Sequence, residues 1–338
     1  MKIALACRVY PTHRPGGMPF VVQDRARALA ALGHDVHVLT TSKDGKSSQL
    51  DDKGVTVHHT NSPECIYSAA FADEYVKYCK AIVFDIVHCD SMNTKIPWWK
   101  DVKGYTACTM HGFSWGSFLT QWNMYRIGLV PINQPPQFKA RETLEEVKAL
   151  NSFGSVIAIS KHECQILKKE FGLRHATVVY NPIPDYFFVD KKPLPAQRML
   201  VCAAISGKKE RLFDMAKSSA SRANIPLSIV SKVPRTQMPR MYDMASALVV
   251  PTAYSQGYDL TIAESLARGR PVIVSDVGSA VMEAEGQTGI VVTALGDQHS
   301  LIKAMSGTLP VVDDQAARAH VPKYHAEKWL EAVKCRCA

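Results

Sequence analysis

Residues 245–291 decide the fold, and they read ASALVVPTAYSQGYDLTIAESLARGRPVIVSDVGSAVMEAEGQTGIV. The apolar run Ala247–Val250 predicts a buried strand, and a loop containing Gly257 follows it. A helical pattern carrying Glu264 comes next, and the apolar run Val272–Ser275 predicts a second strand. A strand, a glycine loop, a helix and a strand in this order place a helix N-terminus, with its partial positive charge, beside an anionic ligand. The segment therefore predicts a site for a phosphorylated sugar compound.

Strand and helix patterns alternate along the rest of the chain. We predict strands at 2–7, 35–40, 55–58, 86–89, 107–111, 155–159, 176–180, 199–203, 226–231, 247–250, 272–275 and 289–292, and helices near 20–33, 68–82, 138–151, 161–171, 208–222, 237–246, 260–268, 298–305 and 323–334. This alternation implies parallel sheets with helices on both faces. A proline-rich stretch at 185–197 interrupts the pattern. We therefore expect an α/β protein with two Rossmann-like domains and a cleft between them.

Composition fits a globular protein of two ordinary domains. The chain has 338 residues, 46% of them hydrophobic, and no apolar run reaches the roughly 18–20 residues of a membrane span. The opening MKIALAC reads as a buried strand rather than a signal peptide. Nine scattered cysteines, an odd number without metal-ligand spacing, favour a reducing cytoplasm.

Positive charge is concentrated in one segment. The formal net charge is +9, and residues 198–240 hold nine Lys and Arg against two acidic residues, a net charge of +7. Such a local field favours an anionic partner, which could be a nucleoside diphosphate, a membrane surface or a nucleic acid. An ordinary solvated surface is the alternative for any one of these side chains.

The quoted segment also resembles the donor-binding signature of a large enzyme family, the retaining GT-B glycosyltransferases of family four. The family motif reads Glu-Gly-Phe-Gly and, after a gap, a second Glu on a helix. Here Gln256 stands in place of the first Glu, and Glu264 matches the second with seven residues between them. The resemblance implies that Glu264 holds the ribose hydroxyls of the donor, and that Gln256 forms an uncharged hydrogen bond to the sugar. It adds Gly257, Tyr258, Asp259, Leu260 and Thr261 to the donor site.

Two motifs of the N-terminal half resemble the same family. Gly16 and Gly17 follow the first strand, where small residues let the backbone approach a ligand, and the family places this loop under the donor pyrophosphate. His111 ends a predicted strand and should point into the ligand crevice. The resemblance gives it a contact with the transferred sugar. A generic tight turn and a structural histidine are the alternatives.

Residues 202–212, CAAISGKKERL, occupy the position of the family's diphosphate-gripping motif, Gly-Arg-Leu, three residues, then Lys-Gly. Lys209 falls on the Lys position, and the resemblance implies that it offsets charge on the departing nucleotide. Ala204 stands where the family has Arg, so that either Lys208 or Arg211 substitutes or the clamp is weaker. Ser206 adds a hydroxyl donor. An exposed basic helix start is the alternative, although cations are disfavoured at a helix N-terminus.

An aromatic-rich stretch that includes Trp115, Phe118, Trp122 and Tyr125 follows His111. They suit stacking on sugars or bases, but their near-helical spacing favours core packing. Near the C-terminus, the segment 320–334 is amphipathic. In GT-B proteins a C-terminal helix often crosses back to the N-terminal domain, and packing on its own domain is the alternative. We expect an acceptor-binding domain over 1–186, a donor-binding domain over 187–318 and the crossing helix over 319–338.

These observations predict a cytoplasmic, metal-independent glycosyltransferase with the GT-B fold. It would move a hexose or related sugar from a UDP- or GDP-linked donor to a saccharide or lipid-linked acceptor with retention, with His111, Lys209 and Glu264 as its catalytic residues and no other cofactor. Hydroxymethylated DNA is the alternative acceptor, because the sequence pI of about 9.0 suits nucleic acid. The same charge suits peripheral contact with an anionic membrane surface. A module that binds nucleotide sugars without transfer is the remaining alternative, motivated by Ala204 and Gln256.

Overall fold

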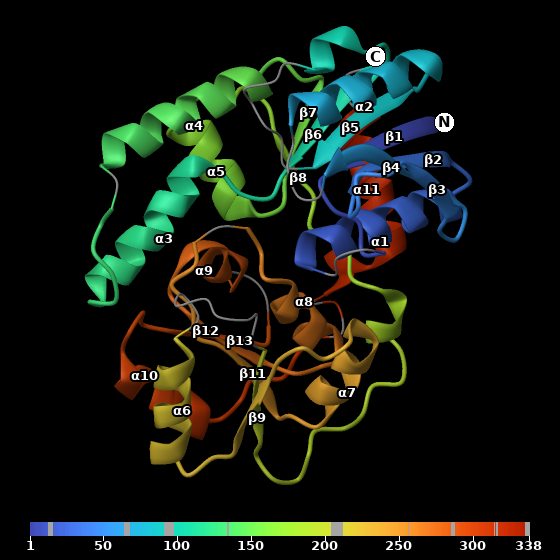
Figure 1. Cartoon of the computed structure of the whole chain (residues 1–338). Coiled ribbons are helices and arrows are strands. Elements are labelled where there is room, and N and C mark those ends of the chain that lie inside the picture. The colour runs from blue at the N-terminus through green and yellow to red at the C-terminus, as the bar shows by residue number, and fades with distance from the viewer. Residues whose placement is uncertain are drawn as a thin grey trace.

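The computed structural model describes residues 1–12, 16–63, 68–90, 98–133, 135–203, 212–255, 257–284, 288–313, 315 and 317–334. These residues form two sheets, one in each half of the chain (Figure 1). The N-terminal sheet has the order β3-β4-β2-β1-β5-β6-β7-β8, and the C-terminal sheet has the order β10-β9-β11-β12-β13. All described strand pairs are parallel except β3 with β4. The predicted fold of two Rossmann-like domains is confirmed, apart from this antiparallel edge.

The strands coincide closely with the apolar runs of the sequence, because strands of a parallel sheet are covered on both faces. They are β1 (Lys2–Cys7), β2 (Asp35–Ser42), β3 (Ser48–Asp51), β4 (Val55–Pro63), β5 (Ile86–Asp90), β6 (Tyr105–Met110), β7 (Ser155–Ala158), β8 (Thr177–Val178), β9 (Leu200–Ala203), β10 (Leu227–Val230), β11 (Ala247–Val250), β12 (Val272–Ser275) and β13 (Ile290–Thr293). Two hydrophobic clusters cover the faces of each sheet.

The helices connect these strands and supply the apolar faces that cover them. They are α1 (Gly17–Ala31), α2 (Ala69–Ala81), α3 (Ser114–Arg126), α4 (Pro136–Leu150), α5 (Lys161–Lys169), α6 (Phe213–Arg222), α7 (Met238–Asp243), α8 (Leu260–Ala267), α9 (Gly278–Ala284), α10 (Gln298–Ser306) and α11 (Pro322–Lys334), with short 3-10 turns η1 (Trp98–Asp101), η2 (Asp185–Phe187), η4 (Arg235–Gln237) and η5 (Arg318–His320). No helix in the described part of the chain has the length and apolar character to cross a bilayer.

Three elements differ from the sequence prediction. The helix α3 was not predicted, because its residues SWGSFLTQWNMYR carry no regular apolar stripe and its N-cap, Phe113, offers no capping side chain. The helix α9 has only seven residues and begins at Gly278, whose φ is +58°. The edge strand β3 is polar and mostly exposed, so it lacks the apolar pattern of the other strands.

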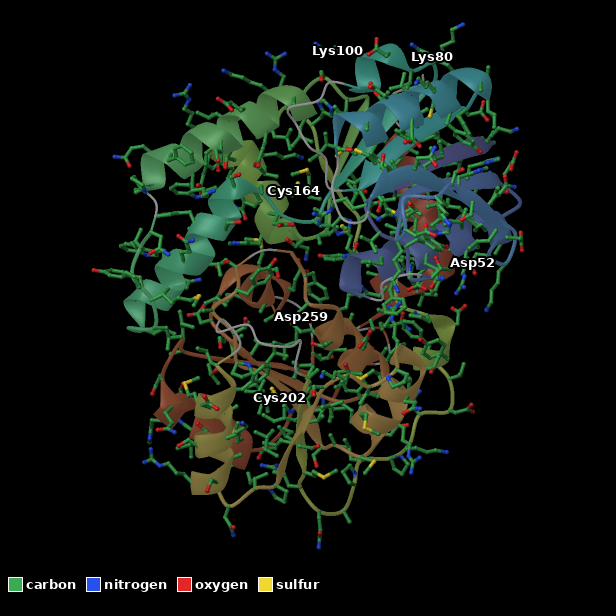
Figure 2. All side chains as sticks on the ribbon, viewed as in Figure 1. Asp52, Lys80, Lys100, Cys164, Cys202 and Asp259 are labelled. Carbon is green, nitrogen blue, oxygen red and sulfur yellow. The ribbon has the colours of Figure 1, made fainter. Side chains whose placement is uncertain are left out.

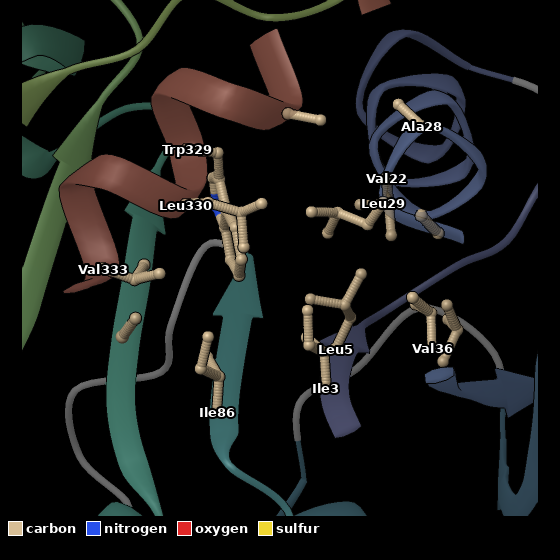
Figure 3. Packing of buried hydrophobic residues seen from close by; sticks show 14 of the residues in the cluster. Ile3, Leu5, Val22, Ala28, Leu29, Val36, Ile86, Trp329, Leu330 and Val333 are labelled. Atoms are coloured by element: carbon tan, nitrogen blue, oxygen red, sulfur yellow. The ribbon is translucent and has the colours of Figure 1, made fainter. Parts of the chain in front are cut away.

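The C-terminal helix α11 crosses back and packs against α1 on the N-terminal sheet (Figure 1). Figure 3 shows Trp329, Leu330 and Val333 turned toward the strand residues of this domain. Trp329 is fully buried, and the Ser155 hydroxyl donates to the Ala332 carbonyl at 2.8 Å. The helix therefore completes the core of the domain that begins the chain.

Candidate functional site

A cleft of about 2210 Å³ lies between the two domains, at the ends of strands from both sheets. It brings together nine residues that the sequence predicted for the site: Gly16, Gly17, His111, Gly257, Tyr258, Asp259, Leu260, Thr261 and Glu264. The other predicted residues, Ser206, Lys208, Lys209, Arg211 and Gln256, lie outside the described residues, as does Ala204. Figure 2 shows Asp259 where the two domains face each other.

Two helices begin at this cleft from opposite sides. The helix α8 is capped by Asp259, whose Oδ1 accepts from the Thr261 amide at 3.2 Å and the Thr261 hydroxyl at 2.9 Å. The helix α1 has Gly16 at its N-cap and no side-chain cap. A Cβ built on Gly17 would lie 4.0 Å from Leu260 Cδ1, so the two helix starts are close neighbours. Their converging dipoles favour a negatively charged ligand between them.

Glu264 projects from α8 into a buried polar cluster at the cleft wall. The Tyr242 hydroxyl donates to Glu264 Oε2 at 2.9 Å, and Arg235 Nε lies 3.6 Å from Oε1. Burial raises the pKa of Glu264 to about 7, even though Arg235 and Tyr242 favour the charged form. The carboxylate is therefore fixed in place and poised between its charged and neutral forms near neutral pH.

Arg235 was not singled out by the sequence, and it connects the two domains. It begins η4 just after β10, and its Nη1 lies 2.6 Å from Oδ2 of Asp24 on α1. Its guanidinium also lies 4.9 Å above the ring of Phe20. Its Nη2 is buried without a hydrogen-bond partner among the described residues. One guanidinium at the wall of the cleft therefore contacts carboxylates from both domains.

The glycine loop before α8 is held by the N-terminal domain. Gly257 has a φ of +65°, and its amide donates to Oε1 of Glu163, on α5, at 2.9 Å. Glu163 is fully buried, and burial raises its pKa to about 7 while the Gly257 bond lowers it. Its Oε2 has no partner among the described residues. Ser160 and Glu163 have the spacing of a capping box, and the Ser160 hydroxyl accepts from the Glu163 amide. The Glu163 carboxylate, however, binds the Gly257 amide of the other domain instead of the start of its own helix.

His111 follows β6 and lines the cleft, as the strand-end position predicted. Its Nε2 donates to Oδ1 of Asp90, the last residue of the neighbouring strand β5, at 2.7 Å. Arg25 on α1 binds both oxygens of Asp90, at 2.8 and 2.9 Å. Burial alone would raise the pKa of Asp90, but Arg25 and the adjacent histidines hold it well below its usual range. A partial signal for this pair is present in the sequence, because Arg25 and Asp90 are charged residues within or next to apolar patterns.

The remaining predicted residues divide between structure and surface. Tyr258 is buried, and its ring stacks on that of His320 with the centroids 5.1 Å apart. The ring of Tyr258 therefore contributes to the packing of the cleft wall. On α3, Phe118 is buried, whereas Trp122 and Tyr125 are 41% and 51% exposed. Core packing therefore accounts for only part of the aromatic set. Within the described residues, no group of three or more His, Cys, Asp or Glu side chains is placed to hold a metal ion.

Solved structures with the same architecture span nearly the whole chain. Sucrose-phosphate synthase from Thermosynechococcus elongatus matches with a TM-score of 0.71 at 15% identity, covering 99% of this chain and 94% of that one. HepE from Anabaena, in complex with UDP-glucose, matches at 0.63 and 13% identity, covering 99% and 95%. WaaG, a glycosyltransferase involved in lipopolysaccharide biosynthesis, matches at 0.61 and 15% identity, covering 99% and 99%. At these identities the likeness shows the fold.

Family models identify the chain more directly. The model for Glycosyltransferase Family 4 matches residues 15–185, and the model for Glycosyl transferases group 1 matches residues 187–310. A search of curated protein sequences gave no significant match. The first model alone covers half of the chain, and the two together cover every described strand except β1. The chain therefore belongs to the family four, group 1 glycosyltransferases with the GT-B fold.

Proposed function

We propose that this glycosyltransferase moves a hexose or related sugar from a nucleoside-diphosphate sugar to a saccharide or lipid-linked acceptor, with retention at the anomeric carbon. The observation that carries the proposal is the meeting of two helix starts and the fixed carboxylate of Glu264 in one interdomain cleft. The helix starts suit a diphosphate, and a carboxylate suits the two hydroxyls of a ribose. A UDP-linked donor agrees with the UDP-glucose bound by HepE, and a GDP-linked donor is the alternative.

In this proposal the donor is held chiefly by the C-terminal domain. Glu264 would accept hydrogen bonds from the ribose, and the amide groups at the starts of α1 and α8 would face the diphosphate. Lys208, Lys209, Arg211 and Ser206 would complete the diphosphate site, and Gln256 would contact the sugar. Arg235 is a cationic residue of the cleft that the family motif does not supply, and the sequence has Ala204 where that motif has Arg.

Catalysis would depend on stabilising the departing nucleoside diphosphate rather than on a covalent intermediate. The dipoles and basic groups offset the charge that develops on this leaving group. Retention would then follow because the acceptor hydroxyl attacks the anomeric carbon on the same face from which the nucleoside diphosphate departs. Neither a metal ion nor a further cofactor enters this proposal.

Contacts between the two domains would hold the cleft closed and exclude water during transfer. The Asn123 amide on α3 donates to the Ser255 hydroxyl at 2.7 Å, and the Thr120 hydroxyl accepts from the Ser255 amide at 3.0 Å. The Tyr180 hydroxyl donates to Glu283 at 2.5 Å, again between the domains. A closed cleft suppresses hydrolysis of the donor.

We place the acceptor on the N-terminal domain, residues 1–186, and the donor on residues 187–318, with residues 319–338 forming the crossing helix. A glycan acceptor is favoured over DNA because, among the described residues of the basic segment, some cations lie away from the cleft. Arg198 binds the carbonyls of Met305 and Gly307, and Arg222 binds Gln298, at positions that do not line the cleft. A cytoplasmic location is proposed because the described cysteines that are buried are free thiols, as in proteins of a reducing compartment.

A donor screen tests the proposal. The purified chain is mixed with UDP-, GDP- and ADP-linked sugars, and the melting temperature and the release of free nucleoside diphosphate are measured with and without saccharide acceptors. We expect one donor class to raise the melting temperature and to release nucleotide faster when an acceptor is present. Donor binding without release would favour a non-catalytic module, and no binding by any donor would refute the proposal.

The acceptor is tested separately with hydroxymethylated duplex DNA. Sugar transfer to this DNA, together with binding that weakens steeply as salt rises, would replace the glycan acceptor by DNA. We expect neither.

A further inference from the structure

A buried charged pair stands directly behind the histidine of the cleft. Asp90 is fully buried at the end of β5, and Arg25 on α1 is 1% exposed. The residues opposite each other in β5 and β6 are Asp90 and Thr109, so His111 emerges two positions further on, beside the carboxylate. Asp90 Oδ1 accepts hydrogen bonds from Arg25 Nη1 at 2.8 Å and from His111 Nε2 at 2.7 Å.

The pair is itself held from further elements, so the carboxylate has little freedom to turn. Arg25 Nε lies 3.3 Å from Nε2 of His325 on α11, and the His325 Nδ1 donates to the Tyr180 carbonyl at 2.7 Å. His88 Nδ1 lies 3.6 Å from Asp90 Oδ2. A buried ion pair adds little stability over apolar residues of the same volume. Stability alone therefore gives no reason for charges at this place.

The arrangement dictates which nitrogen of His111 faces the cleft. Because ionised Asp90 only accepts hydrogen bonds, Nε2 of His111 must carry a proton. With the proton on Nε2, Nδ1 is the nitrogen that carries the lone pair whenever the ring holds a single proton. It makes no hydrogen bond within the described part of the chain and is not among the buried atoms left without a partner there. Since the ring is 10% exposed and lines the cleft, Nδ1 opens toward the ligand.

We propose that Asp90 is a positioning residue, which holds His111 in the tautomer and orientation whose Nδ1 accepts a hydrogen bond from a hydroxyl of the sugar in the cleft. Arg25 supports Asp90 by keeping the carboxylate charged and in place. This inference rests on the proposed function, because it assumes that a sugar occupies the cleft. It extends that function by naming two residues, Asp90 and Arg25, that no sequence motif marked.

The tautomer of His111 tests the inference without any turnover. Long-range proton–nitrogen NMR spectra of the full chain, assigned by comparison with His111→Gln, should show a proton on Nε2 and none on Nδ1. Asp90→Asn should lose or mix this signature, because the amide can donate as well as accept. A wild-type spectrum with the proton on Nδ1 would overturn the inference while leaving the proposed function untouched.

Kinetics supply the second test, with the nucleotide sugar that the wild type turns over. Asp90→Asn should lower kcat by roughly 100-fold, the cost of a misplaced group, with a much smaller change in donor KM. The same substitution in a His111→Gln background should cause little further loss, because both act through one ring. Absence of wild-type turnover would count against the proposed function, and the NMR result would still decide the inference.

A double variant separates positioning from simple charge neutralisation. Asp90→Asn alone leaves Arg25 without its counter-ion, which could unfold the domain. Arg25→Met combined with Asp90→Asn removes both charges and should recover the melting temperature. We expect kcat and the His111 tautomer to stay altered in this folded double variant. Recovery of kcat together with the melting temperature would show that Asp90 only balances Arg25, and the inference would fall.

Discussion

Nη1 of Arg235 lies 2.6 Å from Oδ2 of Asp24, and this contact joins the first helix of one domain to the strand end of the other. Arg235 also faces Glu264, so its loss would deprive two buried carboxylates of their principal cation. We predict that Arg235→Met lowers the free energy of unfolding by about 3–5 kcal/mol. Urea unfolding followed by circular dichroism measures this.

A matched control for this change is Arg222→Met. Arg222 is exposed on α6 and donates to Gln298, so its removal should shift the unfolding free energy by no more than about 0.5 kcal/mol. Equal stability of the Arg235 and Arg222 variants would contradict the bridging role of Arg235.

The second prediction concerns the contribution of Glu264 to the affinity of the protein for the donor nucleotide. Glu264→Gln keeps the shape of the side chain but removes the charge-assisted hydrogen bonds, and we expect UDP or GDP to bind more weakly by roughly 1–3 kcal/mol. Because burial raises the pKa of Glu264 to about 7, the advantage of the wild type should grow as the pH rises through that value. Isothermal titration calorimetry at several pH values measures it, with exposed Glu327→Gln as the control.

The third prediction compares two glycines with left-handed backbones. Gly257 and Gly269 have φ values of +65° and +69°, which cost an alanine roughly 1–2 kcal/mol at either place. A Cβ at Gly257 would also lie 3.3 Å from Ile159 Cδ1, whereas nothing lies within 4 Å at Gly269. We therefore expect similar losses of stability, with the donor KM raised only in Gly257→Ala. Unaltered kinetics in both would mean that the loop position does not govern the site.

The fourth prediction uses the pKa of Glu163, which burial raises from 4.5 to about 7. The folded chain keeps a proton that the unfolded chain releases in this range, so the stability due to this group declines as the pH rises from 4.5 to about 7. Glu163→Gln removes the decline, and its stability relative to the wild type should increase by at most about 3 kcal/mol over this interval. Urea midpoints at either end of the interval measure it. Parallel pH curves for both proteins would refute the shift.

Local patterns in the sequence were sufficient for most of the fold and part of the site. The unit β11–α8–β12 was predicted because strand, loop and helix preferences of neighbouring residues agree, and Glu264 and Gly257 come with it. The helix α3 was missed because its aromatic residues form no single apolar stripe.

The polar contacts at the cleft required the folded structure. Arg235 and Asp24 are 211 residues apart, and Arg25 and Asp90 are 65 apart, so no spacing rule connects them. What the sequence does offer is a charged residue within a buried helix or strand, which indicates that a partner exists but not which one.

The position of α11 has a consequence for how the protein is made. His325 contacts Arg25 across 300 residues of chain, and Trp329 fills the core beneath the first strands. During synthesis, the N-terminal domain is made before the C-terminal domain and therefore lacks the buried Trp329 until α11 has also been made. The part of the N-terminal sheet that α11 covers stays exposed while the C-terminal domain is being translated. We therefore expect the N-terminal domain to depend on chaperones more than the C-terminal domain does.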